Sequence, residues 1–297
     1  MNYSKKVLVT GATGLIGKEL IKPLTELGFK VYAITIDENN PDNGVTWLKG
    51  NLFDYAFIKA IMQDIKPEYL LNMAWATTGD YLTSDINYKF LEVGKYLLEE
   101  FAKNGGKRAI FAGTCFEYKF KDTPLNENDD LDYGKTVYTS CKHKLHKFAE
   151  EFCAKNNISF GYGRVFYVFG NGESPTRLTG MLLDKFSNDQ QVIINSGMLI
   201  KDYLYTKDIA GAFAKFLNSN VEGVVNICSA NPITIKEYCL RIADKMGKTE
   251  LLIFEDKVID QPLFIVGDNK RLLDEVGYDY QFTFDEAIED LLCLAKI

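Results

Sequence analysis

Short apolar segments alternate with longer amphipathic ones over the first two thirds of the chain. Short apolar runs are typical of strands that are buried on both faces of a parallel sheet. Such runs predict strands at residues 6–10, 31–36, 69–73, 108–112 and 158–165. Amphipathic segments between them predict helices at residues 15–27, 55–64, 88–102 and 138–156. This alternation predicts an α/β fold with a doubly wound parallel sheet, because right-handed crossovers place helices on both faces.

The pattern changes after about residue 170. A loop rich in Gly, Ser, Pro and Thr at 170–179 is followed by shorter elements. We expect helices at 181–187, 206–217 and 233–246, the last of these capped by Thr234, and a strand at 224–227. We therefore expect residues 1–168 to form the main sheet domain, with elements at about 204–228 returning to it. Residues 169–203 and 229–297 would form a smaller C-terminal lobe.

The composition fits a globular protein and excludes several classes. The 297 residues are 46% hydrophobic and 25% charged, and their net charge of −7 argues against a nucleic-acid partner. No apolar stretch is long enough to predict a membrane span. A strand-like run begins within the first few residues, so we expect no signal peptide. The six cysteines form no CxxC pair, which favours reduced thiols and a cytoplasmic location.

Metal and hydrolase chemistry find little support in the sequence. The only two histidines, His143 and His146, lie three apart on one predicted helix, and no third ligand follows at an obvious spacing. We therefore expect no metal site. The sequence also contains no GxSxG nucleophile elbow.

Three glycines follow the first predicted strand directly. Gly11 permits a tight turn, Gly14 lets the backbone approach a pyrophosphate, and Gly17 lets the next helix pack close to the sheet. The open N–H groups and the positive end of that helix favour phosphate. The main sheet domain is therefore predicted to bind a dinucleotide.

Tyr138 and Lys142 lie four residues apart on a predicted helix and so share one face. A tyrosine titrates near pH 10, and moving its pKa about three units toward neutrality takes roughly 4 kcal/mol of preferential phenolate stabilisation. A nearby ammonium can supply part of that energy. The pair is therefore a candidate acid/base couple.

The GxxGxxG spacing at residues 11–17 and the YxxxK spacing at 138–142 together resemble the extended short-chain dehydrogenases/reductases. Further similar segments are Asn72-Met73-Ala74-Trp75, Gly50-Asn51-Leu52, residues 113–118, residues 164–170 and residues 201–208. In two of them the sequence departs from the family pattern, with Asn51 for an aspartate and Lys201 for an arginine. The resemblance covers roughly residues 6 to 275 and implies a Rossmann domain followed by a substrate-binding lobe.

The resemblance implies site residues of three kinds. Tyr138 would be the acid/base residue, Lys142 its partner, and Thr114 a hydroxyl that binds the substrate oxygen. The cofactor would lie against Gly11, Thr13, Gly14, Leu15, Ile16, Gly17, Thr35, Asn51, Leu52, Ala74, Trp75, Ala76, Tyr138 and Lys142. The substrate would lie against Thr114, Cys115, Phe166, Arg177, Lys201, Tyr203 and Arg271, whose cations would meet a diphosphate.

Family members share hydride transfer at a sugar carbon and differ in the chemistry after it. Dehydratases of the family carry Asp and Glu after the Ser or Thr, whereas this chain has Cys115 and Phe116, and Glu117 is displaced by one. Residues 74–76, 81–84 and 113–118 resemble a bacterial subgroup that includes CDP-abequose synthase and the dTDP-4-keto-6-deoxyglucose reductases. This resemblance implies reduction of a C4 ketone on a nucleotide-linked 4-keto-6-deoxysugar. A nucleotide-sugar 4-epimerase with tightly bound NAD stays open, and a non-enzymatic binder is disfavoured because Thr114, Tyr138 and Lys142 are all present.

Two expectations concern the cofactor and the assembly. An acid at the end of the second strand would favour NAD, but that position is Thr35, so NADP is expected and NAD is the alternative. Relatives commonly dimerise through two helices of each subunit. The resemblance therefore implies a homodimer through the helices at 88–102 and 138–156.

Overall fold

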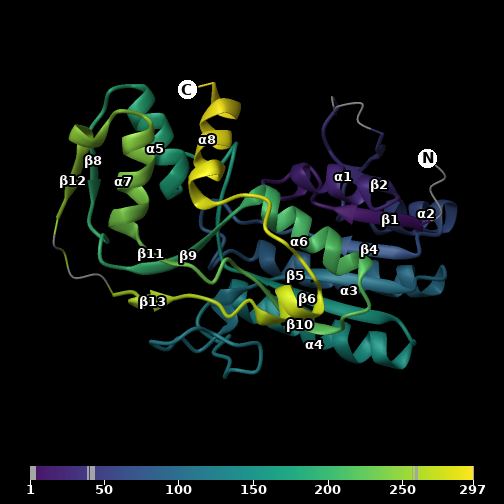
Figure 1. Ribbon diagram of the computed structural model, residues 1–297. Helices are drawn as coiled ribbons and strands as arrows, with labels where there is room; N and C mark the ends of the chain where they lie inside the picture. The colour runs from purple at the N-terminus through teal and green to yellow at the C-terminus, as the bar shows by residue number, and fades with distance from the viewer. Residues whose placement is uncertain (1–4, 39, 41–43, 256, 258–259, 297) are drawn as a thin grey trace.

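The computed structural model describes residues 5–38, 40, 44–255, 257 and 260–296. Its main feature is a seven-stranded sheet, shown in Figure 1. The strands are β1 (Lys5–Thr10), β2 (Phe29–Thr35), β3 (Thr46–Lys49), β4 (Tyr69–Asn72), β5 (Arg108–Thr114), β6 (Ser159–Val165) and β10 (Gly223–Ile227). They run in the order β10-β6-β5-β4-β1-β2-β3, and every neighbouring pair is parallel. The strand order reverses beside β1, and ligands bind outside the carboxyl ends of strands at such a switch point.

Helices cover both faces of this sheet (Figure 1). One face packs against α1 (Gly17–Glu26) and α6 (Thr206–Asn218), and the other packs against α2 (Tyr55–Ile65), α3 (Ile86–Lys103) and α4 (Val137–Lys155). Successive residues of a strand point to opposite faces. Val7 and Val9 of β1 accordingly join the core with α1 and α6, and Leu8 joins the core with the other three helices. The doubly wound parallel sheet is therefore confirmed.

The remaining elements form a smaller group around a separate core. They are the helices α5 (Leu178–Ser187), α7 (Ile235–Lys245) and α8 (Phe284–Ala295) and the strands β7 (Tyr167–Phe169), β8 (Val192–Ile194), β9 (Ile200–Tyr205), β11 (Pro232–Thr234), β12 (Leu252–Phe254) and β13 (Phe264–Ile265). Three short helical turns, η1 (Cys115–Glu117), η2 (Thr249–Leu251) and η3 (Arg271–Glu275), complete the chain. β9 pairs with β7, β11 and β13, and β8 pairs with β12. Phe169, Phe186, Tyr238 and Leu291 are central to this core.

The predicted elements are confirmed, with ends that differ by a few residues. The Thr234 cap is also confirmed, since its hydroxyl accepts the Glu237 N–H at 3.0 Å. β3, α8 and the short strands of the smaller group were not predicted from the sequence. β3 has four residues, none of them fully buried, so it lacks the apolar run that predicts the other six strands of the main sheet.

Candidate active site

The loop between β1 and α1 has no room for side chains at two of its glycines. Gly11 has a φ of +69°, and a Cβ on it would lie 2.8 Å from the Ala74 nitrogen. A Cβ on Gly17 would lie 1.9 Å from the Gly11 carbonyl oxygen. No side chain caps the amino end of α1, whose N-cap residue is Ile16. The first-turn N–H groups are therefore open to an anion, and the loop fits a dinucleotide pyrophosphate.

Thr10 joins this loop to the end of β4, a role that the sequence analysis did not predict. The fully buried Thr10 hydroxyl donates to Oδ1 of Asn72 at 2.6 Å and accepts the Ala74 N–H at 3.1 Å. Asn72 and Ala74 belong to the segment that resembles the family's cofactor-lining strand end. Thr10 therefore holds that backbone against Gly11.

Tyr138 and Lys142 lie in the first two turns of α4 and are both buried. Thr136 caps this helix by accepting the Thr139 N–H at 3.1 Å, which sets where the helix begins. The Lys142 ammonium donates to the Ala112 carbonyl of β5 at 2.7 Å. Thr114 ends the same strand, and its hydrogen bond to the Tyr138 phenol acts to lower the pKa of that phenol. The structure thus brings the three predicted catalytic residues together.

Burial sets the protonation of this pair. It raises the pKa of Tyr138, and the neighbouring Tyr81, Glu117 and Cys115 raise it further against the effect of Thr114. Burial lowers the pKa of Lys142 to about 7, although the Glu117 carboxylate opposes the change. Tyr138 is therefore a neutral phenol near pH 7, which is the form that donates a proton.

Glu117 lies in a buried polar cluster with Tyr162 and Arg164, close enough to Lys142 to affect its pKa. Its carboxylate accepts the Tyr162 hydroxyl at 2.9 Å and the Arg164 Nε–H at 3.1 Å. Candidate ligand atoms of Glu117, His143 and His146 lie within 4.8 Å of one another, so the fold supplies a third ligand that the sequence did not indicate. Both carboxylate oxygens are already engaged, however, and a guanidinium lies beside them. The chemistry of this cluster therefore suits an ion pair better than a divalent cation.

Three residues that were expected to contact the cofactor, Thr35, Asn51 and Leu52, lie at the ends of β2 and β3. The buried Thr35 hydroxyl accepts the Asp37 N–H at 3.0 Å, so it is turned inward. Oδ1 of Asn51 accepts the Phe53 N–H at 2.9 Å, and Leu52 packs against the core. The backbone carbonyl of Thr35 accepts the Gly50 N–H at 2.8 Å. β2 itself ends at Thr35, which is no carboxylate, and the Glu38 carboxylate three residues later is paired with Lys49 at 2.6 Å.

The predicted substrate residues fall into two groups. Cys115, Phe166, Lys201 and Tyr203 are all buried. Lys201 donates to the Pro262 carbonyl at 2.9 Å, and burial lowers its pKa to about 8; Tyr203 stacks on Tyr238 at 4.1 Å. Arg177 is half-buried, and its charge acts to lower the pKa of Tyr81, whose ring meets Tyr138 edge-on at 5.1 Å. Arg177 therefore lies near Tyr81, one ring away from Tyr138, whereas Lys201 is buried and acts on the pKa of Cys115.

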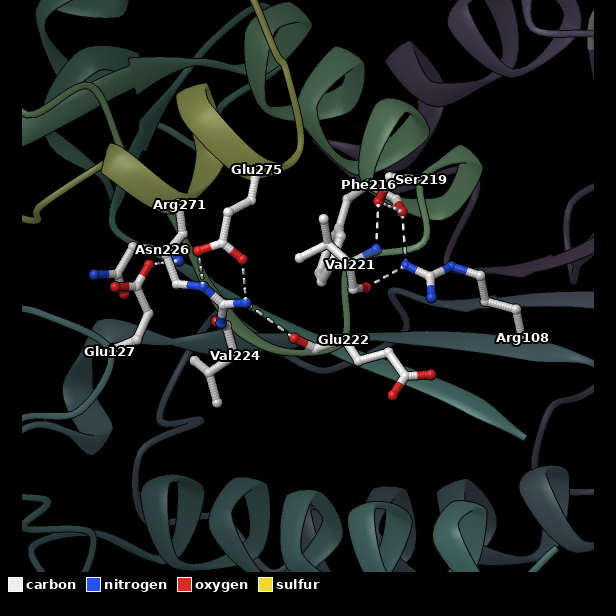
Figure 2. Close-up of polar contacts among 10 residues, drawn as sticks. All are labelled: Arg108, Glu127, Phe216, Ser219, Val221, Glu222, Val224, Asn226, Arg271 and Glu275. Carbon is white, nitrogen blue, oxygen red and sulfur yellow. Dashed lines mark hydrogen bonds and ion pairs between the residues drawn. The ribbon is translucent and has the colours of Figure 1, made fainter. Parts of the chain in front are cut away.

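The structure does not bring Arg271 to this group. Figure 2 shows its guanidinium on the Glu275 carboxylate, at 2.7 and 2.8 Å, and on the carbonyls of Glu222 and Val224. Glu222 and Val224 lie at the amino end of β10, near the segment that binds Arg108, the first residue of β5. Thr114 is at the carboxyl end of β5. Because the strands are parallel, Arg271 lies at their amino ends, and Thr114 lies at their carboxyl ends. The expectation that Arg271 contacts the substrate is therefore wrong.

Known proteins resemble the chain over almost its whole length. The model of the "NAD dependent epimerase/dehydratase family" matches residues 7–228. A dTDP-4-dehydro-6-deoxyglucose reductase of Escherichia coli is 26% identical, over 96% of each chain, and a CDP-abequose synthase of Salmonella typhimurium is 24% identical, over 98% of this chain and 99% of its own.

The fold also matches a solved enzyme structure. The UDP-N-acetylglucosamine 4-epimerase of Methanobrevibacter ruminantium, in complex with UDP-N-acetylmuramic acid, superposes with a TM-score of 0.87 at 20% identity and covers 98% of each chain. The family model covers far more than half of the chain, and the loop after β1 fits the dinucleotide that the family's name implies. The chain therefore belongs to the NAD dependent epimerase/dehydratase family.

Proposed function

We propose that this protein reduces the C4 ketone of a nucleotide-linked 4-keto-6-deoxysugar, with Tyr138 as the general acid. The observation that carries the proposal is the meeting of the Tyr138 phenol, the Thr114 hydroxyl and the Lys142 ammonium at the carboxyl edge of the sheet, where burial keeps the phenol protonated. Two relatives that match nearly the whole chain bear the names of a 4-ketoreductase and of CDP-abequose synthase, which supports this substrate class.

Each catalytic residue has one task. When bound, the reduced nicotinamide supplies the hydride. Tyr138 gives its phenolic proton to the oxygen that was the ketone, and Thr114 donates a hydrogen bond to the same oxygen and so orients the carbonyl. The Lys142 ammonium stabilises the phenolate that Tyr138 becomes. The cofactor is held by Gly11, Thr13, Gly14, Leu15, Ile16, Gly17, Asn51, Leu52, Ala74, Trp75 and Ala76.

Dehydration is disfavoured because a second acid/base pair is missing beside Thr114. Cys115 is buried, and burial raises the pKa of its thiol, while Phe116 cannot exchange a proton. The Glu117 carboxylate is turned toward Tyr162 and Arg164. The three residues that follow Thr114 directly therefore supply no acid or base for removing water.

The substrate binds where the smaller group of elements faces the carboxyl edge of the sheet, and Arg177 meets its diphosphate. Arg177 precedes α5 and donates to the Thr77 carbonyl at 2.7 Å, which leaves other guanidinium N–H groups for a ligand. Residues 169–203 and 229–297 form the substrate-binding lobe in this proposal. Cys115 and Phe166 belong to one buried apolar cluster beside Thr114, and with Lys201 and Tyr203 they complete the proposed substrate residues.

NADP is the proposed cofactor. β2 ends at Thr35 without a carboxylate that would accept from the ribose 2′ hydroxyl, and Lys49 is in register with Thr35 on β3. Lys49 is paired with the Glu38 carboxylate at 2.6 Å, and it would have to turn from Glu38 to meet a 2′ phosphate. Michaelis constants for NADPH and NADH test this choice, and a lower value for NADH would reverse it.

A homodimer is proposed through α3 and α4, which pack against each other. Large side chains near this surface are exposed, including Tyr55 at 45% and Tyr88 at 48%. They border a hollow that is also lined by Phe53, Lys89 and Glu92. Sedimentation equilibrium of the wild type and of Tyr88→Glu tests this interface.

A reaction assay tests the function. Purified protein is mixed with NADPH and a dTDP- or CDP-4-keto-6-deoxyhexose, and absorbance at 340 nm is followed. Stoichiometric loss of absorbance is expected, whereas no loss with any such ketone excludes the proposal. The alternative is a nucleotide-sugar 4-epimerase, which the name of the matching solved enzyme supports. An epimerase would retain NAD through purification and would convert its substrate without added reductant.

A further inference from the structure

The Lys142 ammonium rests on the ring of Trp75. Nζ lies 4.1 Å from the ring centroid of Trp75 and 6.0 Å from that of Tyr138. An ammonium over an indole face is attracted by the ring quadrupole, and the attraction is strongest where water is excluded. Lys142 is 5% exposed. The ring therefore supplies part of the solvation that burial removes from the ammonium.

Trp75 is held rigidly in that orientation. Its Nε1–H donates to Oδ1 of Asn87 at 2.7 Å, and its ring stacks on Phe90 at 5.3 Å with an interplanar angle of 23°. Asn87 is fully buried. Its Nδ2 donates to the carbonyls of Tyr81 and Ser84 at 2.6 and 2.7 Å. The Asn87 amide thus fixes both the indole and the segment 81–84.

The same segment also contacts Tyr138. The Tyr138 N–H donates to the Leu82 carbonyl at 3.1 Å, and the Tyr81 ring meets the Tyr138 ring at 5.1 Å and 86°. Trp75 meets the Tyr138 ring edge-on at 6.2 Å. Asn87 therefore ties together the groups that border Lys142 and those that border Tyr138.

We propose that Trp75 is a positioning residue, whose ring face holds the Lys142 ammonium charged beside Tyr138, and that Asn87 fixes the ring in this role. The proposal rests on the assignment of Tyr138 and Lys142 as the catalytic pair. It concerns the indole side chain, which is a different feature from the Trp75 backbone that is expected to line the cofactor.

Other charges reach this pair from neighbouring elements. Glu117, from the turn after β5, acts to raise the pKa of Lys142, and it is itself paired with Arg164 of β6. Tyr81 and Cys115 act on Tyr138. On α4 itself, His143 and His146 are buried, and burial lowers the pKa of both rings, so they are neutral near pH 7. Beside the Ala112 carbonyl, which accepts from Nζ at 2.7 Å, the ring of Trp75 and the Glu117 carboxylate therefore stabilise the Lys142 charge.

One test needs no substrate. The chain has two tryptophans, so in Trp47→Phe the indole of Trp75 is the only one left. We expect its fluorescence to titrate around pH 7, the value to which burial lowers the pKa of Lys142. The titration should disappear in Trp47→Phe/Lys142→Met and persist in Trp47→Phe/Tyr138→Phe. Emission that does not change with pH, or that titrates equally without Lys142, overturns the proposal. Circular dichroism confirms that each variant is folded over the range measured.

The second test uses turnover. In Trp75→Leu the ammonium loses the ring face, so the pKa of Lys142 falls and activity is lost at lower pH than in the wild type. We expect the alkaline limb of the pH profile of kcat to move to lower pH by about one unit. This shift corresponds to a tenfold change in the ratio of charged to neutral Lys142. Trp75→Phe should move it less, because benzene binds a cation more weakly than indole does.

Phe148→Leu is the matched control, because Phe148 stacks on Phe152 of the same helix α4 and is not one of the rings over which Lys142 lies. We expect it to lower stability and leave the limb in place. If Trp75→Leu lowers kcat at every pH without moving the limb, the ring is merely structural and the proposal fails. If the wild type reduces no ketone, the proposed function fails, and the fluorescence titration still decides the role of Trp75.

Discussion

The Arg164 guanidinium donates its Nε–H to Oε2 of Glu117 at 3.1 Å, and neither side chain is more than 2% exposed. Tyr162 donates to the other carboxylate oxygen at 2.9 Å. Glu117 lies three residues after Thr114, in the turn that follows β5, and Arg164 lies on the neighbouring strand β6. A buried pair of this kind adds little net stability, but removing one partner leaves an uncompensated charge.

Glu117→Gln should therefore destabilise the protein by about 3–5 kcal/mol, because Arg164 would remain buried without its counter-charge. The free energy of unfolding from urea titrations measures this loss. Tyr162→Phe is the control, since it removes one hydrogen bond and keeps the charge pair, and it should cost about 1 kcal/mol. Equal losses in the two variants would contradict the importance of the charge.

Gly17→Ala should weaken NADPH binding more than about tenfold, because its methyl group would collide with the Gly11 carbonyl and displace the phosphate loop. Fluorescence quenching measures the dissociation constant. Gly134→Ala is the matched control, since a Cβ there meets nothing within 4 Å. Unchanged binding in Gly17→Ala would mean that this loop does not hold the cofactor.

Tyr138→Phe should lower kcat at least about a hundredfold, because the ring keeps its place but has no proton to donate. Thr114→Val should lower kcat about a hundredfold by removing the hydrogen bond to the developing alkoxide. Thr114→Ser keeps the hydroxyl and should restore most of that loss. Rates at 340 nm with saturating NADPH measure all three, and a Tyr138→Phe enzyme with normal turnover would exclude the mechanism.

Lys142 should make stability depend on pH. Its pKa is lowered from 10.5 in the unfolded chain to about 7 in the folded protein. Between those values the unfolded chain binds more protons, so the free energy of unfolding gains from this group as pH rises and loses it as pH falls toward 7. Lys142→Met should flatten that slope and be more stable at pH 7. Urea titrations at pH 7 and 9 measure the difference, and an unchanged slope would mean that Lys142 is not buried in solution.

Arg177→Met should raise the KM for the nucleotide sugar about tenfold and change kcat little, because a cation for the diphosphate is lost before the chemical step. Arg271→Met should leave this KM unchanged and lower stability, since it removes contacts with Glu275, Glu222 and Val224 at the other edge of the sheet. Steady-state kinetics and thermal unfolding separate the two effects. A raised KM in Arg271→Met alone would reverse the assignment.

Local patterns were sufficient for the parts of the site that lie within one short segment. The glycines at 11, 14 and 17 follow a strand and open a helix, so their spacing alone indicates a phosphate loop. Tyr138 and Lys142 meet because a helix brings residues four apart onto one face, and Thr136 determines where that helix begins. These relationships depend on backbone geometry over a few residues.

Contacts between distant segments were beyond the reach of such patterns. Arg271 was expected to meet a diphosphate, yet η3 packs it at the amino end of β10. Glu117 lies too far along the chain from His143 and His146 to be grouped with them by spacing. The pairing of β5 with β6 brings it to Arg164, and the packing of α4 against these strands brings it to the two histidines.

The sequence by itself determined the parallel sheet, the glycine loop after β1 and the helical spacing of Tyr138 and Lys142, because each is encoded by a period or a spacing that a short stretch of chain contains. Only the tertiary structure decided which charges and rings surround that pair. Trp75 lies over Lys142 because β4 and β5 are neighbours in the sheet and end at the same edge. Strand order depends on how the whole core is buried, and no local spacing encodes it.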